Sequence, residues 1–173
     1  MRQRIKGLSL WQPWASLMAV GAKKIETRSW STPYRGYVAI HAAKKWNADL
    51  RETAMGVMFQ AALQSECSVK AVHDESVKRY SPSTLPRGCF VAVGRLQHCF
   101  STTDHSKLIP TCDERWFGDY SEDRFMWVFD EIWKLSSPVY AIGQRNLWHI
   151  EEDQAGVIID MLPDEVREQE FGE

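Results

Sequence analysis

The chain has no run of apolar residues that approaches the roughly 18 residues that a membrane-spanning helix requires. Its positively charged start, residues 1–6, is not followed by an apolar stretch of signal-peptide length before Gln12 and Pro13. We therefore expect a cytoplasmic protein that has no membrane partner.

Cysteine is scarce, and its spacing does not match the usual metal and redox motifs. The four cysteines, Cys67, Cys89, Cys99 and Cys112, are 22, 10 and 13 positions apart, whereas zinc sites and redox motifs use close pairs. We expect reduced thiols, no metal site and no cofactor. Cys89 and Cys99 are an even number of positions apart in one predicted strand, so they would share a buried face.

Two further absences limit the classes of enzyme. No serine has the flanking glycines of a nucleophile elbow, and the chain has no glycine-rich loop of the kind that binds phosphates. The sequence therefore does not predict a serine hydrolase or a P-loop protein.

Acidic residues are nearly absent from the first part of the chain, although the net charge is only −2. Residues 1–45 contain nine Lys or Arg and one acid, Glu26, whereas residues 150–173 contain nine Asp or Glu and one base, Arg167. A basic face suits a polyanion such as nucleic acid, through phosphate contacts and counterion release. The alternative is that the acidic end folds back on the basic part.

The pattern of apolar residues predicts an α+β fold. A length of 173 residues is enough for one domain with its own core, and we expect that domain over 1–155, with an acidic helix or tail over 156–173. Alternation predicts strands over 5–10, 24–30, 37–43, 88–100 and 124–133, and spacings of three and four predict a helix over 47–63. Residues 64–87 are rich in serine and proline, which is typical of an exposed connection.

The densest cluster of charged and aromatic side chains lies in residues 21–30. Gly21 is a typical helix-ending residue. If residues 24–30 form a strand, Glu26, Arg28 and Trp30 share one face, because successive side chains alternate between faces. Lys23 would lie next to them.

This cluster has three interpretations. In a catalytic one, Lys23 deprotonates a water or polarises a carbonyl, with Glu26 as its partner base. In a binding one, Glu26 accepts a hydrogen bond from the exocyclic amine of a base, Arg28 and Lys23 hold phosphate, and a tryptophan stacks on the base. In the third, Glu26 and Arg28 form only a surface ion pair, worth about 0 to 1 kcal/mol.

Other candidate ligand-binding residues flank the cluster. Trp11 and Trp30 are the candidate stacking plates, and Asp119 and Tyr120, in an aromatic loop, would complete the pocket from its far side. The alternative for His41 is a purely structural role. The full set of candidates is Ser9, Trp11, Gln12, Trp14, Lys23, Glu26, Arg28, Trp30, His41, Lys44 and Lys45.

The stretch Ser9-Leu10-Trp11-Gln12-Pro13-Trp14 leads into Gly21, Lys23, Glu26 and Arg28, which are spaced as Gly-x-Lys-x-x-Glu-x-Arg. Here the sequence resembles the ASCH family, a branch of the PUA-like superfamily, over most of residues 7–150. The resemblance implies a PUA-like small β-barrel with surrounding helices and a cleft lined by the motif.

The same resemblance implies binding of RNA, more than DNA, or of a modified nucleoside. Bacterial ASCH-type amidohydrolases that remove the acetyl group from 4-acetylcytidine use the lysine at the position of Lys23, with a threonine where this chain has Glu26. The alternative function is therefore that of a metal-independent hydrolase, a 4-acetylcytidine-type amidohydrolase or a ribonuclease, that uses Lys23 and Glu26. If the chain binds nucleic acid, the basic first 45 residues predict that binding to single-stranded RNA or DNA weakens steeply as salt rises.

Overall fold

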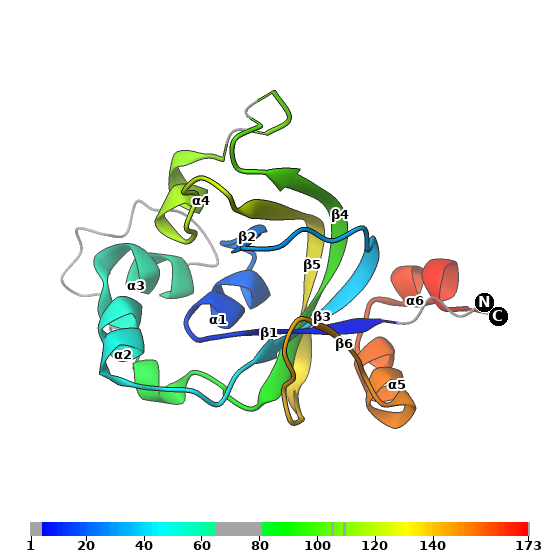
Figure 1. The fold of residues 1–173 in the computed structure, drawn as a ribbon. Helices are drawn as coiled ribbons and strands as arrows, with labels where there is room; N and C mark the ends of the chain where they lie inside the picture. The colour runs from blue at the N-terminus through cyan, green and yellow to red at the C-terminus, as the bar shows by residue number, and fades with distance from the viewer. Residues whose placement is uncertain (1–4, 65–80, 105, 109, 173) are drawn as a thin grey trace.

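Two long antiparallel strands, β4 (Cys89–Ser101) and β5 (Phe125–Tyr140), form the centre of the fold (Figure 1). The structure is a computed structural model that describes residues 5–64, 81–104, 106–108 and 110–172. β-Bulges interrupt the pairing on both sides of Gly94. A bulge bends its strand, so β4 and β5 curl. Gly94 also makes room for Phe129, because a Cβ at this position would lie 2.6 Å from its ring.

Four shorter strands complete a six-stranded sheet in the order β2-β5-β4-β3-β1-β6. They are β1 (Lys6–Leu10), β2 (Ile25–Arg28), β3 (Gly36–Ala42) and β6 (Leu147–His149). β1 and β3 pair in parallel, and the other pairings are antiparallel. Arg28 lies on β2 and Ser9 lies on β1, and three strands separate β2 from β1 in the sheet. Even so, Arg28 Nη2 donates a hydrogen bond of 3.0 Å to the Ser9 carbonyl oxygen. The sheet is therefore curled into an open barrel (Figure 1), which confirms the expected α+β fold with a small β-barrel and surrounding helices.

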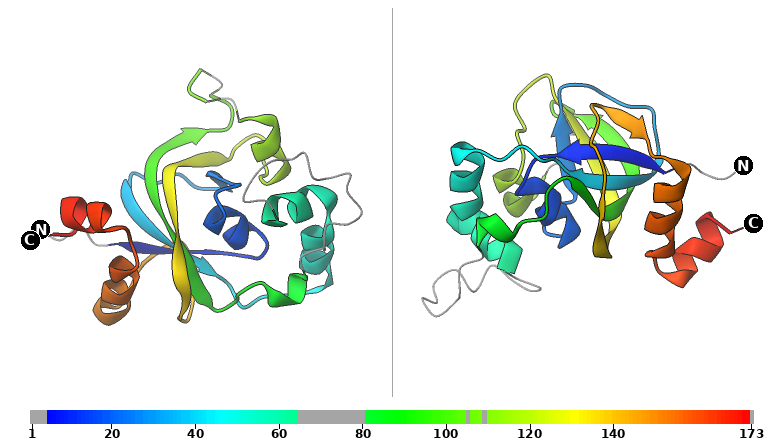
Figure 2. Two further views of the ribbon diagram at one scale, coloured as in Figure 1. Left: turned by 180° about the vertical axis from the view of Figure 1, so that it is seen from behind. Right: turned by 90° about the horizontal axis from the view of Figure 1, so that it is seen from below.

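Helices lie on both sides of the curled sheet (Figure 2). Helix α1 (Trp14–Ala19) occupies the concave side, where Ala15 and Met18 join the core formed by β1, β3, β4 and β5. Gly21 follows with φ of +75°, as predicted for a helix-ending glycine. The remaining helices are α2 (Ala48–Met55), α3 (Val57–Gln64), the 3-10 helix η2 (Pro82–Thr84), α4 (Cys112–Trp116), α5 (Glu152–Asp160) and α6 (Asp164–Glu170).

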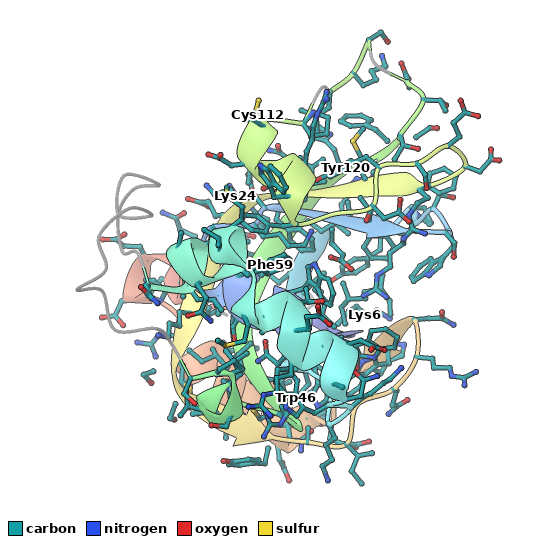
Figure 3. The ribbon with its side chains drawn as sticks, turned by 90° about the vertical axis from the view of Figure 1, so that its left-hand side faces the viewer. Lys6, Lys24, Trp46, Phe59, Cys112 and Tyr120 are labelled. Atoms are coloured by element: carbon teal, nitrogen blue, oxygen red, sulfur yellow. The ribbon has the colours of Figure 1, made fainter. Side chains whose placement is uncertain are left out.

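The prediction of one continuous helix over 47–63 is wrong, because two helices, α2 and α3, occupy this range. The Asn47 side chain caps α2 by accepting a hydrogen bond from Leu50 N. The backbone then becomes extended at Gly56, with φ of −57° and ψ of 141°, before α3 begins. Figure 3 shows the two helices lying across one side of the molecule, between Trp46 and Tyr120.

The acidic end of the chain forms two helices rather than one acidic helix or a frayed tail. Ile158 and Leu162 are buried in a second core on the outer face of the sheet, and the ring of Phe171 lies 4.8 Å from that of Tyr37. These contacts are apolar. Helices α5 and α6 lie on the side of the sheet away from α1 (Figure 1), so the acidic segment does not cover the motif around Glu26.

The free thiols of Cys89 and Cys99 belong to the same core cluster, as expected from their spacing. Cys67 lies outside the described residues, as does most of the connection predicted over 64–87. Within the part of the chain that the structure describes, every helix is too short or too polar to span a lipid bilayer.

Candidate functional site

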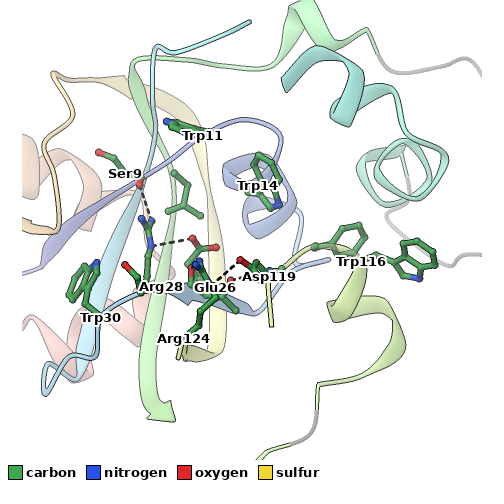
Figure 4. Close-up of a pocket in the computed structure, with 14 residues that line it drawn as sticks. Ser9, Trp11, Trp14, Glu26, Arg28, Trp30, Trp116, Asp119 and Arg124 are labelled. Carbon is green, nitrogen blue, oxygen red and sulfur yellow. Dashed lines mark hydrogen bonds and ion pairs between the residues drawn. The ribbon is translucent and has the colours of Figure 1, made fainter. Parts of the chain in front are cut away.

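A hollow of about 590 Å³, here called the pocket, opens between the start of α1, strand β2 and the segment after α4 (Figure 4). Its volume lies within the range of small-molecule sites. The lining combines aromatic, charged and small polar residues: Ser9, Leu10, Trp11, Trp14, Glu26, Thr27, Arg28, Ser29, Trp30, Trp116, Phe117, Gly118, Asp119 and Arg124.

Glu26 presents a carboxylate to the pocket between two cations. Its Oε1 lies 3.2 Å from Arg28 Nε, and its Oε2 lies 3.3 Å from Lys23 Nζ. Strand alternation places Glu26 and Arg28 on the same face of β2, as predicted. Each carboxylate oxygen can accept more than one hydrogen bond, so this anion retains acceptor capacity toward a ligand.

Lys23 lies behind the pocket and is absent from its lining. Its side chain is fully buried, and Nζ donates a hydrogen bond to the Ile25 carbonyl oxygen while it faces Glu26. Burial of an ammonium group is costly unless it is paired and hydrogen-bonded. The geometry therefore favours Lys23 as the group that positions the Glu26 carboxylate, rather than as a direct contact to a ligand.

Arg28 connects the two sides of the pocket. Besides its ion pair with Glu26, it donates the hydrogen bond to Ser9 O described above, so Ser9 contributes its backbone to the site. The Arg28 side chain is 25% exposed. The interpretation of Glu26 and Arg28 as a surface ion pair does not describe this environment, because both residues line a hollow.

Glu114, on α4, is a buried carboxyl group close to this cluster that the sequence did not single out. It accepts a hydrogen bond from the backbone N–H of Lys24, which ties α4 to the start of β2. Burial raises the pKa of Glu114, and it also raises the pKa of the neighbouring Tyr120, which lies behind the pocket near Lys24 and α4 (Figure 3). Lys23 and Glu26 are among the charges that act on Glu114.

Replacing Glu114 by glutamine is expected to reduce the pH dependence of stability. Because the folded-state pKa is raised, the protonated form stabilises the fold, and this contribution is full below the unfolded-state pKa of about 4.3. It is lost as pH rises through the folded-state pKa. Glutamine does not titrate and keeps an oxygen for Lys24 N–H.

Thermal unfolding from pH 4 to pH 8 tests this expectation. Relative to the Glu114→Gln variant, the wild-type protein should lose melting temperature as pH rises. Glu122→Gln, at an exposed carboxyl group outside the pocket, is the matched control. Parallel curves for the wild type and the Glu114→Gln variant would contradict the assignment.

The segment after α4 forms the far wall of the pocket. Asp119 N donates a hydrogen bond of 3.2 Å to Thr27 Oγ1, and the Asp119 carboxylate lies 3.4 Å from Arg124 Nε. Hydrogen bonds from Ser121 lower the pKa of Asp119. Asp119 thus lines the pocket from the far side, where the sequence placed it, whereas Tyr120 does not line it.

Four tryptophans line the pocket, and they differ in exposure. Trp11 is 48% exposed and Trp116 is 61% exposed, so both offer a ring face to a ligand. Trp14 and Trp30 are partly buried, and the Trp30 ring packs edge-on against Trp127 at 4.5 Å. Trp116 was not among the candidates, although its place beside Phe117 and Gly118 in an aromatic loop was a usable signal.

Gln12 and His41, both candidate ligand residues, are buried away from the pocket. Gln12 Nε2 donates to Pro86 O at 2.7 Å and its Oε1 accepts from Ser16 N, so it joins α1 to the segment before β4. His41 Nε2 lies 3.1 Å from Ala141 O. Burial lowers the pKa of His41. Gln12 and His41 are therefore buried polar side chains with hydrogen-bond partners inside the protein, which is the environment of structural residues.

Lys44 and Lys45 are exposed on the segment after β3, next to the pocket rather than in it. Lys45 Nζ lies 3.8 Å from the centroid of the Trp11 ring. The pocket therefore brings together six of the eleven predicted residues, Ser9, Trp11, Trp14, Glu26, Arg28 and Trp30. Over residues 5–64, 81–104, 106–108 and 110–172, no three His, Cys, Asp or Glu side chains are placed to share a metal ion.

Comparison with known proteins gives one family match. The family model described as ASCH domain matches residues 8–134. Activating signal cointegrator 1 of Homo sapiens is 26% identical over 155 residues, and the Mus musculus protein of the same name is 25% identical. Each alignment covers 81% of this chain but 24% of the relative, so the chain spans about a quarter of the length of these curated relatives.

Solved structures share the fold at low sequence identity. The crystal structure of ASCH from Zymomonas mobilis aligns with a TM-score of 0.50 and 10% identity, covering 91% of this chain and 95% of that one. A tyrosine-to-phenylalanine mutant of the same protein aligns with the same score and identity, covering 92% and 99%. At this identity the likeness concerns the fold alone.

Proposed function

This chain belongs to the ASCH domain family, and from that premise we propose that its pocket binds one nucleobase of an RNA strand or a nucleoside. The base we propose carries an exocyclic amine, and DNA is the less favoured polymer. The observation that carries the proposal is the Glu26 carboxylate, held between Lys23 and Arg28 in a pocket lined by tryptophans.

The carboxylate supplies the polar recognition. Carboxylate side chains accept hydrogen bonds from base amines such as cytosine N4. Lys23 and Arg28 each hold one oxygen of Glu26, so its orientation is set before a ligand arrives. Preorganisation of this kind improves affinity because less ordering remains to be done on binding.

The tryptophans supply the apolar recognition. Stacking of a base on an aromatic ring contributes about 1 to 3 kcal/mol and tolerates every base, since each has a π-face. Trp11 and Trp116 have the exposed ring faces, whereas Trp30 is packed against Trp127. Arg28 and Arg124 add positive charge for a nearby phosphate.

Replacing Trp116 by alanine is expected to weaken binding of a fluorescein-labelled single-stranded RNA by about 5- to 150-fold, which corresponds to the loss of one stacked base. Fluorescence anisotropy measures the dissociation constants. Tyr140→Ala is the matched control, because Tyr140 is an aromatic residue 76% exposed outside the pocket. The proposal fails if the wild type binds no RNA or nucleoside, or if both variants bind as the wild type does.

Hydrolysis is the second candidate function. The observation in its favour is the contact of Lys23 with Glu26, near a second carboxyl group, Glu114, whose pKa is raised by burial. The burial of Lys23 Nζ against Ile25 O speaks against direct attack by this amine on a ligand. Release of acetate from 4-acetylcytidine, or cleavage of a labelled oligonucleotide, by the wild type but not by Glu26→Gln would establish turnover.

A further inference from the structure

We propose that a second surface beside the pocket binds the backbone phosphates of the nucleotides next to the bound base. This surface, here called the basic ridge, consists of Trp11, Lys44, Lys45, Trp46 and Arg87. Because this surface would bind phosphates of neighbouring nucleotides, the proposed ligand is a single-stranded oligonucleotide rather than a free nucleoside. The inference rests on the proposed function, because the base bound in the pocket positions the oligonucleotide along the ridge.

The ridge is continuous with the pocket through Trp11. This residue lines the pocket, and its ring also lies under Lys45 Nζ at 3.8 Å. A strand whose base enters the pocket therefore passes an ammonium group as it leaves. Lys45 is exposed, and its charge is held in place by the ring beneath it.

The second half of the ridge repeats the same pairing of a cation with an indole. The guanidinium carbon of Arg87 lies 5.1 Å from the Trp46 ring. Lys44 lies beside Arg87, because its aliphatic stem packs on Gly88, where a Cβ would come within 2.7 Å of Lys44 Cε. Three cations from two separate segments thus follow Trp11.

The backbone that carries Arg87 is fixed from several directions. Gln12 Nε2 donates to the carbonyl oxygen of Pro86, the preceding residue. On the other side, Gly88 N donates to Ala42 O at 2.6 Å and Gly88 O accepts from Ala141 N. The buried Gln12, which sequence alone placed in the ligand site, therefore positions the ridge.

Within residues 5–64, 81–104, 106–108 and 110–172, no carboxylate pairs with the ridge cations. Among the described residues, Lys44, Lys45 and Arg87 take part in no ion pair, and Arg87 Nη1 is buried with no hydrogen-bond partner. By contrast, carboxylates pair with Lys23, Arg28, Arg95, Arg124 and Arg167.

Unpaired cations interleaved with indole rings match the chemistry of a single strand. Lys and Arg contact phosphates and release counterions, while aromatic faces accept bases in sequence-tolerant stacking. An acidic peptide would supply the negative charge but not the flat bases. Because the ridge adjoins a pocket with a base acceptor, the structure favours the oligonucleotide.

The test compares two ligands and two triple variants. Dissociation constants are measured for a labelled seven-nucleotide single-stranded RNA, by anisotropy at several salt concentrations, and for cytidine, by calorimetry. The ridge variant carries Lys44→Gln, Lys45→Gln and Arg87→Gln. The control variant carries Lys107→Gln, Lys134→Gln and Arg145→Gln, which remove the same charge at exposed positions outside the pocket and the ridge.

The ridge variant is expected to bind the RNA at least tenfold more weakly at 0.1 M salt and to bind cytidine as the wild type does. Its slope of log affinity against log salt should be smaller by about 2, at about 0.7 per phosphate contact. The control variant should bind RNA within about threefold of the wild type, as expected for charges outside the contact surface. If Arg87→Gln lowers the folded fraction, the Lys44→Gln/Lys45→Gln double variant repeats the test.

Three results would overturn the inference. An equal loss of RNA affinity in both triple variants would assign the effect to net charge. If the wild type binds RNA no more tightly than cytidine, the ridge does not bind a nucleic-acid strand, while the pocket remains as proposed. The same conclusion follows if poly-glutamate competes at concentrations that match those of RNA. Absence of both RNA and cytidine binding in the wild type would remove the proposed function and the inference together.

Discussion

Replacing Glu26 by glutamine is expected to weaken cytidine binding by about 10- to 150-fold, because a hydrogen bond to a charged acceptor contributes about 1.5 to 3 kcal/mol. The amide keeps the size of the side chain but removes the anion that Lys23 and Arg28 hold in place. Uridine, which carries a carbonyl oxygen where cytidine has an amine, should lose little or even gain affinity. Isothermal titration calorimetry with both nucleosides measures the effect.

The glutamine variant leaves the buried Lys23 without its anion, so its folded fraction has to be measured alongside binding. Glu26→Asp is the second variant, since it keeps the charge while it withdraws the carboxylate from the pocket by one methylene. It should remain folded and still bind cytidine more weakly than the wild type. Unchanged cytidine affinity in both folded variants would contradict the assignment of Glu26 as the base acceptor.

Replacing Lys23 by methionine is expected to lower the free energy of unfolding by about 3 kcal/mol. Breaking a buried ion pair by removing one partner costs about 3 to 5 kcal/mol, and the lower end applies because Glu26 is 13% exposed and keeps Arg28 as a partner. The variant also loses the hydrogen bond from Nζ to Ile25 O. Urea denaturation at pH 7 measures the change.

The neighbouring lysine provides the matched control. Lys24 is exposed, so Lys24→Met should change stability by no more than about 0.5 kcal/mol. The double variant Lys23→Met/Glu26→Gln should be less destabilised than the sum of the single variants, because the two side chains interact directly. A Lys23→Met variant as stable as Lys24→Met would show that Lys23 does not hold the carboxylate.

Local periodicity predicted the part of the site that lies on one strand. Alternation along β2 placed Glu26 and Arg28 on one face, and Gly21 was correctly expected to end a helix. Lys23 precedes the strand, so strand alternation does not predict the direction of its side chain. Its burial depends on the position of Ile25 O and Glu26, which a sequence pattern does not specify.

The remaining parts of the site come from distant segments. Glu114 accepts a hydrogen bond from the N–H of Lys24, which is 90 positions away in the sequence. It lies on a five-residue helix capped by Thr111, and such a cap predicts where a helix starts but not which strand it contacts. The link from Gln12 to Pro86 likewise depends on how α1 packs against the segment before β4. The curled fold could be expected from strand patterns and family resemblance, but these long-range contacts required the structure.

The break between α2 and α3 shows the same limit at a smaller scale. Apolar residues continue at helical spacing through Gly56, so periodicity alone predicts one helix. The backbone turns extended at Gly56, which separates the two helices, and a Cβ at this position would lie 3.1 Å from Thr53 O. Packing of Phe59 against Trp14 and Phe117 then sets the direction of α3 toward the pocket wall.

The central claim is that the pocket recognises a base through its exocyclic amine, and the affinity of the wild-type protein for cytidine relative to uridine tests it most directly. The two nucleosides have the same size and stacking surface but exchange a donor for an acceptor at the position that Glu26 would contact. We expect cytidine to bind at least about tenfold more tightly than uridine, as one hydrogen bond to a carboxylate allows. Equal affinities, or tighter binding of uridine, would contradict the claim.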